Sequence, residues 1–302
     1  MVKPRILLSC TVVLFLSLSC LRFTHEGFST SPTMPGDDVT IQESIKPSAT
    51  RTIQFSGYNW TVKDSNGELW GPGPNYFNSS NESVWLDGNG DLHLKIRNVS
   101  GNWHCAEVYT QSSFGHGKYR FEMASGFENL DVNIVLGLFT YLNDENEIDI
   151  EFARWGQASV SNGQYVLQPS YHTGNIHRFP MEGMGSNSSH EFAWCEEYVK
   201  FKSYWGDGSN PTGGNIISEW LYVGNDNPPE STEHVHINLW LMSGLAPANL
   251  QEAEVIVKGF DFTVDDCNEQ VYLPQLITVL AITVPVGILV LAVSVVLWKR
   301  KR

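Results

Sequence analysis

The feature that most constrains the fold is a series of short runs rich in β-branched and aromatic residues, separated by Gly, Asn, Asp and Pro. No helical period of useful length interrupts them between residues 51 and 266. Many short runs with turn residues between them predict an all-β sandwich or barrel. The expected strands are Ser83–Leu86, Asp91–Ile96, Lys118–Met123, Val132–Phe139, Glu147–Phe152, His190–Trp194, Tyr198–Lys202, Val235–Leu241 and Ala253–Val257.

The segment Asp87-Gly-Asn-Gly lies between two of these runs and predicts a hairpin turn, because glycine supplies the positive φ that such turns need. Its first positions are also those of a calcium loop. The further oxygen ligands and the closing Glu of such a loop are missing, so the turn is favoured.

The first residues of the chain have the pattern of a secretory signal peptide. A short basic start is followed by an apolar run from Ile6 to Leu18 and by small residues. This run is shorter than the ~20 residues that a membrane-spanning helix needs. We therefore expect a signal peptide at 1–22 and, after it, a spacer rich in Ser, Thr and Pro at 23–50.

The other end predicts a membrane anchor. Leu276 to Trp298 is apolar and without charge, and the basic residues 299–302 follow at once. This pattern is typical of a transmembrane helix, here at 274–298, with a positive cytoplasmic tail. The protein is then expected in the cell membrane as a single-pass protein whose folded domain, at 51–266, lies outside the cell.

The cysteines and asparagines fit that location. Cys105, Cys195 and Cys267 lie outside the signal region, and two of the three could form a disulfide; their pairing is left open by the sequence. Five triplets match the acceptor pattern for N-glycosylation. They begin at Asn59, Asn78, Asn81, Asn98 and Asn187.

The charge of the chain narrows the class of ligand. There are 33 Asp and Glu against 19 Lys and Arg, and several basic residues lie at the two ends. A body this acidic repels phosphate backbones and other polyanions, which disfavours nucleic acid and sulfated polysaccharides as partners. Neutral molecules therefore remain as candidate ligands.

The most informative motif is a ladder of acids, Glu147, Asp149 and Glu151, within one expected strand. Because side chains alternate along a strand, these acids share one face while the apolar residues between them pack on the other. A solvated outer face is the alternative. Adjacent carboxylates, however, raise one another's pKa and can leave one of them protonated near neutral pH. Cleavage of a glycosidic bond needs such a combination of one ionised and one protonated carboxyl group.

The spacing adds a geometric condition. The first and last acids are ~13 Å apart along a flat strand, whereas a retaining glycosidase brings its two carboxyl groups to about 5 to 5.5 Å. The strand is therefore predicted to curve, with its concave side carrying the acids.

The segment Glu147-Ile-Asp-Ile-Glu-Phe resembles the active-site signature of glycoside hydrolase family 16, the retaining β-glucanases. The resemblance extends to Trp103–Val108, Gly115–Met123, His190–Trp194 and Asn238–Trp240. It implies a concanavalin-like β-jelly roll, a sandwich of two curved antiparallel sheets, for residues 51–266.

The resemblance also implies roles for individual residues. Glu147 would be the nucleophile, Glu151 the general acid/base and Asp149 an assisting acid. The residues expected to bind the sugar are Glu107, Phe139, Tyr141, His172, Asn238 and Trp240. Apart from the motif match, the aromatic ones would be assigned to the core, Glu107 to the surface and His172 to a structural role.

Two departures leave the substrate open. Tyr109 stands where lichenase-type members have Arg, and Glu145 stands where they have Trp. No cofactor is required for the reaction. Some relatives bind a structural calcium ion, and Asp261 is then the equivalent of one ligand.

The sequence therefore predicts a membrane-tethered, extracellular retaining endo-β-glucanase that hydrolyses β-1,3 or mixed β-1,3/1,4-glucan. One alternative is a transglycosylase that remodels envelope polysaccharide. Another is a non-catalytic carbohydrate-binding or adhesion protein on the same fold, since fold alone does not determine function.

Overall fold

The computed structural model describes residues 50–182, 187–206, 215–264 and Cys267. The predicted signal peptide, transmembrane helix and basic tail lie outside these residues, as does the spacer except for Thr50. Within the described part of the chain, no helix is long and apolar enough to cross a membrane.

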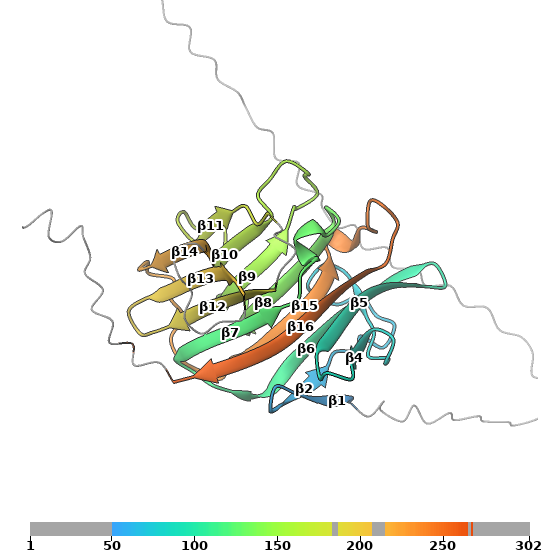
Figure 1. Ribbon diagram of the computed structural model, residues 1–302, viewed down its shortest axis with the longest axis horizontal. Coiled ribbons are helices and arrows are strands. Elements are labelled where there is room, and N and C mark those ends of the chain that lie inside the picture. Colours follow the sequence, from blue (N-terminus) through green and yellow to red (C-terminus); the bar gives the residue numbers. More distant parts are fainter. Residues whose placement is uncertain (1–49, 183–186, 207–214, 265–266, 268–302) are drawn as a thin grey trace, which may run out of the picture. The chain divides into compact units, whose positions relative to one another are not determined.

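Two antiparallel layers of strands make up the domain (Figure 1). In the first sheet the spatial order is β1 (Thr52–Phe55), β2 (Tyr58–Val62), β6 (Asn102–Ser113), β15 (His234–Leu241), β8 (Ile134–Asn143), β9 (Asn146–Ala153), β10 (Gly163–Leu167) and β11 (Ile176–Phe179). In the second sheet it is β4 (Val84–Leu86), β5 (Leu92–Val99), β16 (Ala253–Thr263), β7 (Gly117–Met123), β12 (Ser188–Trp194), β13 (Val199–Trp205) and β14 (Ile216–Tyr222).

The two sheets are continuous at one place, where β5 and β6 form a hairpin. The short strand β3 (Tyr76–Phe77) adds to β6 in parallel orientation. Two 3₁₀ helices, η1 (Phe127–Asn129) and η3 (Met242–Gly244), complete the regular structure of the described residues. The predicted all-β, jelly-roll-like sandwich is confirmed, and each expected strand falls on an observed one.

The core lies between the sheets and follows from alternation along the strands. On β9, Ile148 and Ile150 are fully buried in the hydrophobic core. From β10, the Tyr165 ring stacks on Phe201 of β13, with 4.8 Å between ring centroids. Because β9 commits its apolar side chains to this core, its acids face the opposite surface of the first sheet.

The predicted turn at Asp87 joins β4 to β5. The Asp87 carboxylate accepts hydrogen bonds from the backbone N–H of Asn89 at 2.8 Å and of Asp91 at 3.0 Å. Gly90 has a φ of +87°, a conformation that glycine adopts without steric cost. The interpretation as a turn is confirmed.

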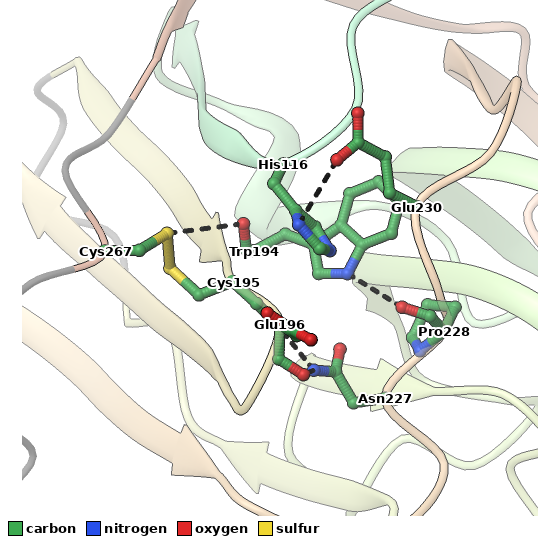
Figure 2. Close-up of a disulfide and its surroundings, with 8 residues drawn as sticks. All are labelled: His116, Trp194, Cys195, Glu196, Asn227, Pro228, Glu230 and Cys267. Atoms are coloured by element: carbon green, nitrogen blue, oxygen red, sulfur yellow. Dashed lines mark hydrogen bonds and ion pairs between the residues drawn. A yellow bond between two sulfur atoms is a disulfide. The ribbon is translucent and has the colours of Figure 1, made fainter.

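A disulfide joins Cys195 to Cys267 (Figure 2). Cys105 is a free, buried thiol. Burial raises the pKa of Cys105 to about 12, so it is uncharged at neutral pH. Cys195 lies in the turn between β12 and β13, and Cys267 lies beyond the end of β16. The bond therefore fastens the C-terminal side of the domain to the second sheet.

Candidate active site

A groove of about 460 Å³ runs across the first sheet, on the face that carries the acids of β9. Glu147, Asp149 and Glu151 line it together with side chains from β6, β8 and β15. Asp149 is 2% exposed, and its two neighbours in the ladder are half-buried. The ladder therefore lies in a hollow and not on a solvated outer face.

The strand register brings residues from five strands into one row across the sheet. Each member pairs with the next one across the sheet. The members are Glu107 on β6, Asn238 on β15, Gly137 on β8, Glu151 on β9 and Gln164 on β10. Side chains in register on neighbouring strands lie on the same face. The row therefore puts Glu107 and Asn238 on the same face as Glu151, with Asn238 two strands away from it and Glu107 three strands away.

Gly137 leaves space at the floor of the groove, because it has no side chain. A Cβ atom at this position would lie 2.6 Å from the side-chain oxygen of Asn238 and 3.3 Å from the Phe139 ring. The missing side chain lets the Asn238 amide occupy the floor of the groove. Its oxygen is buried and has no hydrogen-bond partner among the described residues.

Burial raises the pKa of all three acids. Burial and the charges of Glu151 and Asp144 together raise the pKa of Glu147 to about 7, against the lowering effect of a hydrogen bond from Asp149. Burial, followed by the charge of Asp149, raises the pKa of Glu151 to about 8. The pKa of Asp149 lies well above its usual value because the group is buried beside Glu147. Fewer than three charges are therefore present at neutral pH.

The hydrogen bonds of Asp149 indicate where its proton lies. Gln168 donates from Nε2 to Oδ2 of Asp149 at 3.1 Å, and its own Oε1 accepts the backbone N–H of Ser170 at 2.8 Å. This second bond fixes the orientation of the Gln168 amide, so Asp149 accepts on that side. Asp149 also shares a hydrogen bond with Glu147, which lowers the pKa of Glu147. The protonated member of this pair is therefore Asp149, and Glu147 carries the charge.

Glu151 has a different partner. Gln164 on β10 donates from Nε2 to the Glu151 carboxylate at 2.6 Å, which favours the charged form and opposes the effect of burial on the pKa. The remaining amide oxygen of Gln164 is buried without a partner in the described part of the chain. Glu147 and Glu151 thus differ in their surroundings, as an acid and a base of one reaction must.

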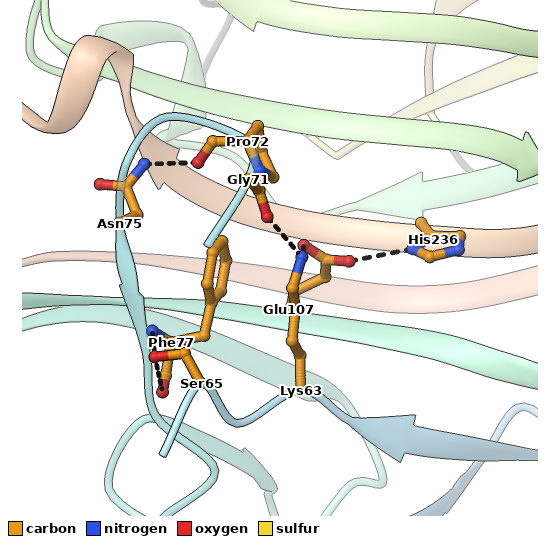
Figure 3. A network of polar contacts seen from close by, with 8 residues as sticks. All are labelled: Lys63, Ser65, Gly71, Pro72, Asn75, Phe77, Glu107 and His236. Carbon is orange, nitrogen blue, oxygen red and sulfur yellow. Dashed lines mark hydrogen bonds and ion pairs between the residues drawn. The ribbon is translucent and has the colours of Figure 1, made fainter. Parts of the chain in front are cut away.

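Glu107 lies at the β6 side of the groove in an ionic network (Figure 3). It is 3% exposed, and its carboxylate oxygens lie 2.8 Å from Lys63 Nζ and 3.0 Å from His236 Nδ1. Burial alone would raise its pKa, but the hydrogen bond from His236 and the charge of Lys63 hold it below the usual value. Glu107 is therefore an ionised hydrogen-bond acceptor and not a proton donor.

The same lysine fixes one wall of the groove. Lys63 Nζ also donates to the carbonyl oxygen of Gly71 at 2.7 Å. Asn75 Nδ2 donates to the carbonyl oxygens of Pro72 and Leu241 at 2.7 and 2.8 Å. The loop between β2 and β3 is thereby held against β15, and it contributes Trp70, Gly71 and Pro72 to the lining.

Aromatic rings cover the middle of the groove. The His236 ring stacks between Tyr109 and Phe139, with centroid distances of 5.2 and 5.0 Å. Tyr141 extends the cluster, and its hydroxyl donates to Asp144 at 2.9 Å. Trp240 lies further along β15 and also lines the groove. The groove therefore offers apolar ring faces next to carboxylates.

The structure brings most of the predicted site residues together. Those that line the groove are Glu107, Phe139, Tyr141, Glu147, Asp149, Glu151, Asn238 and Trp240. His172 does not line it; its Nδ1 lies 3.0 Å from Asp226 in a separate pocket. Asp261 faces Arg120 on the second sheet. Among the described residues, no group of three or more His, Cys, Asp or Glu could hold a metal ion.

Sequence reasoning missed several residues of the groove. His236 had a usable signal, because it lies two residues before Asn238 on one strand and so shares its face. Lys63, Trp70 and Asp144 come from loops or strand ends. Gln164 and Gln168 reach the acids only through the pairing of β10 with β9.

No protein-family model matches the sequence, and a search of curated proteins finds no match either. Several solved structures are similar to the fold of this chain. The β-glucanase of Bacillus licheniformis has a TM-score of 0.50 at 19% identity, covering 73% of this chain and 100% of that one. A glycosyl hydrolase family 16 protein of Mycobacterium smegmatis has a TM-score of 0.50 at 16% identity, covering 68% and 91%. A protein of Mycobacterium tuberculosis described as an immunostimulatory antigen and pseudo β-1,3-glucanase has a TM-score of 0.51 at 20% identity, covering 68% and 91%.

At these identities the likeness is one of fold. The expected resemblance to the family 16 β-glucanases is confirmed at that level. The activity has to be argued from the groove itself.

Proposed function

We propose that the protein is a retaining endo-β-glucanase that hydrolyses a neutral β-1,3 or mixed β-1,3/1,4-glucan. The observation that carries this proposal is the acid ladder of β9, whose three carboxyl groups line one hollow, have raised pKa values and differ in their hydrogen-bond partners. Such a set supplies a charged nucleophile and a proton donor in one hollow.

In the first step the Glu147 carboxylate attacks the anomeric carbon of the sugar, and Glu151 gives its proton to the departing glycosidic oxygen. A covalent glycosyl-enzyme forms, and the remainder of the glucan leaves as an alcohol. In the second step Glu151, now charged, takes a proton from water, whose oxygen attacks the same carbon and releases Glu147. The Asp149 hydrogen bond keeps Glu147 ionised between turnovers.

The lining of the groove supports a neutral sugar polymer as substrate. Tyr141 and Trp240, which are half-buried, offer apolar faces for pyranose rings, whereas Phe139 is buried and stacks on His236. The unpaired oxygen of Asn238 can accept a hydroxyl hydrogen bond. Among the described lining residues, the one lysine is already paired with Glu107, and none is an arginine. A sulfated or uronate polymer would lack cationic partners here.

We also propose that the domain lies outside the cell and is attached to the membrane by the C-terminal segment. This part of the proposal rests on the apolar and charged patterns at the two ends of the chain. The disulfide between Cys195 and Cys267 is compatible with an oxidising compartment.

A non-catalytic carbohydrate-binding protein is the second candidate. The observation in its favour is that one of the similar structures is described as a pseudo β-1,3-glucanase. The acid ladder speaks against it for this chain, because a binding protein has no need of three adjacent carboxyl groups in one groove, whose mutual repulsion lowers stability.

The test is the release of reducing ends from barley mixed-linkage glucan, laminarin, xyloglucan, agarose and carrageenan. The full-length chain in detergent is compared with Glu147→Gln and with Glu182→Gln, which alters an exposed acid outside the groove. We expect cleavage of one of the first two glucans, a loss of several orders of magnitude in Glu147→Gln, and wild-type activity in Glu182→Gln.

Two further measurements identify the mechanism. Azide should restore cleavage to Glu147→Ala, because a small anion can occupy the place of the missing carboxylate, and the product should have the inverted anomeric configuration. Azide should not give this inverted product with Glu151→Ala. NMR should show that the first sugar released has the β configuration. Binding of a glucan by a folded protein that cleaves none of the substrates and forms no transfer products would favour the non-catalytic alternative.

A further inference from the structure

A second pocket, of about 320 Å³, lies next to the groove. Three connections form it: the turn between β8 and β9, the turn between β10 and β11, and the loop between β14 and β15. Its lining is mostly amide side chains and prolines, with the aromatic ring of Tyr171 and the imidazole of His172. Of its lining residues, only Gln168 takes part in the site described above, through its hydrogen bond to Asp149.

Tyr171 is the outstanding side chain of the pocket. It is 82% exposed, although a tyrosine ring presents a large apolar surface to water. Its turn is nevertheless well braced. The ring packs edge-on against His172, which contacts Asp226 at 3.0 Å, and Asp226 also accepts a hydrogen bond from Asn175 at 2.9 Å. An exposed ring held on a braced turn is available to a ligand.

The opposite wall of the pocket is held by the disulfide region (Figure 2). Asn227 Nδ2 donates to the carbonyl oxygens of Cys195 and Glu196 at 2.8 and 3.1 Å. The indole nitrogen of Trp194 donates to the carbonyl oxygen of Pro228 at 3.1 Å. The loop between β14 and β15 is thus tied to the cross-linked turn, so both walls of the pocket are pre-organised.

The pocket borders the groove, although the two have no lining residue in common. Asn146 lines the pocket, and the next residue, Glu147, lines the groove. Gln168 also lines the pocket, while its amide nitrogen donates to Asp149 in the groove. A polymer that lies across Glu147 and extends past this side of β9 therefore meets the pocket next.

We propose that this pocket is an additional carbohydrate-binding site for the part of a glucan chain that extends beyond the groove. Tyr171 stacks on the apolar face of one sugar ring, and the amides of Asn146 and Asn225 contact its hydroxyl groups. Glu145 and Asp226 make the pocket unfavourable for anions, so its ligand is a neutral sugar. The assignment of the chain to a glucan rests on the proposed function.

The test measures binding separately from cleavage. Full-length Glu147→Gln protein in detergent is run in native gels that contain barley mixed-linkage glucan or laminarin, alone and combined with Tyr171→Ala, Tyr171→Phe or Leu250→Ala. Leu250 is the matched control, because it is 68% exposed and lies in the loop between η3 and β16. Since stacking on an aromatic ring contributes roughly 0.5–1.5 kcal/mol, Tyr171→Ala should weaken retention roughly two- to tenfold. Tyr171→Phe keeps the ring and should bind as the parent does, and Leu250→Ala should have no effect.

Cleavage provides a second readout. In the enzyme with Glu147 intact, Tyr171→Ala should lower kcat/KM for the long glucan several-fold more than for a short oligosaccharide, because only the long chain reaches the pocket. Retention of Tyr171→Ala equal to that of its parent overturns the inference, as does failure of the parent to bind either glucan. If the wild type cleaves nothing but Tyr171→Ala still weakens retention, the proposed hydrolysis is wrong and the carbohydrate site stands.

Discussion

The pH dependence of glucan cleavage should follow from the charge states of Glu147 and Glu151. The reaction needs Glu147 ionised and Glu151 protonated. Glu147, with a pKa of about 7, loses its charge as the pH falls, and Glu151, with a pKa of about 8, loses its proton as the pH rises. The productive fraction is then roughly 0.6 at pH 7.5 and roughly 0.01 at pH 5, so kcat/KM should fall about 60-fold over this interval and similarly towards pH 10.

The assay is kcat/KM between pH 4.5 and 10 at constant ionic strength, with the folded state checked at each pH. Gln164→Leu supplies the matched perturbation. It removes the hydrogen bond that favours charged Glu151, so the alkaline limb should move to higher pH while the acidic limb remains. Gln251→Leu, a change at an exposed glutamine, should move neither limb.

Either of two results would refute this reasoning. An acidic limb near pH 4.5, the ordinary pKa of a glutamic acid, would show that burial in the groove does not set the charge of the nucleophile. An alkaline limb unmoved in Gln164→Leu would show that this amide does not stabilise the charged form of Glu151.

Three further predictions concern stability and groove geometry. Cys195→Ser removes a cross-link to Cys267 across a sequence separation of 72 and should lower the free energy of unfolding by about 4 kcal/mol, visible as a lower Tm than in the oxidised wild type; an unchanged Tm would contradict it. Gly137→Ala should lower kcat/KM and cost about 1–3 kcal/mol of stability in urea titration, because the new methyl group would displace the Asn238 amide; full activity would contradict this. The pKa of Asp149 is higher in the folded than in the unfolded protein, so this group destabilises the fold as the pH rises above its unfolded-state pKa. Asp149→Asn removes this effect and should therefore raise Tm more at pH 7 than at pH 5. An equal change in Tm at both pH values would contradict this prediction.

The parts of the fold that could be predicted are those encoded within single strands. The alternation of acids with Ile148 and Ile150 placed the two faces of β9 correctly, because the period of a strand is a local property. The strands that composition did not predict include the edge strands β1, β11 and β14 and also β2, β6 and β10, which lie inside the first sheet. β10, for example, is buried at all five of its positions, so it lacks the alternation of a strand that has one solvated face.

The residues of the candidate site also fall into those that local sequence could predict and those that it could not. Asn238 and Trp240 were placed through a resemblance, and His236 shares their face by simple alternation. Lys63 and Gln164 could not be found from the sequence, because each meets its acid through contacts between segments far apart in the chain. Their roles follow from strand register, which depends on the whole sheet and not on any one run of residues.

The disulfide between Cys195 and Cys267 has a mechanical consequence if the residues after it anchor the protein. A pull on that anchor arrives at Cys267 and is shared between the end of β16 and the turn that joins β12 to β13. Both belong to the second sheet, where β16 is held between β5 and β7. The strands that carry the acid ladder lie in the other layer, outside this path of force. Tension along the anchor would therefore load the second sheet first and reach the groove only through the loop between β14 and β15, which is hydrogen-bonded to the cross-linked turn.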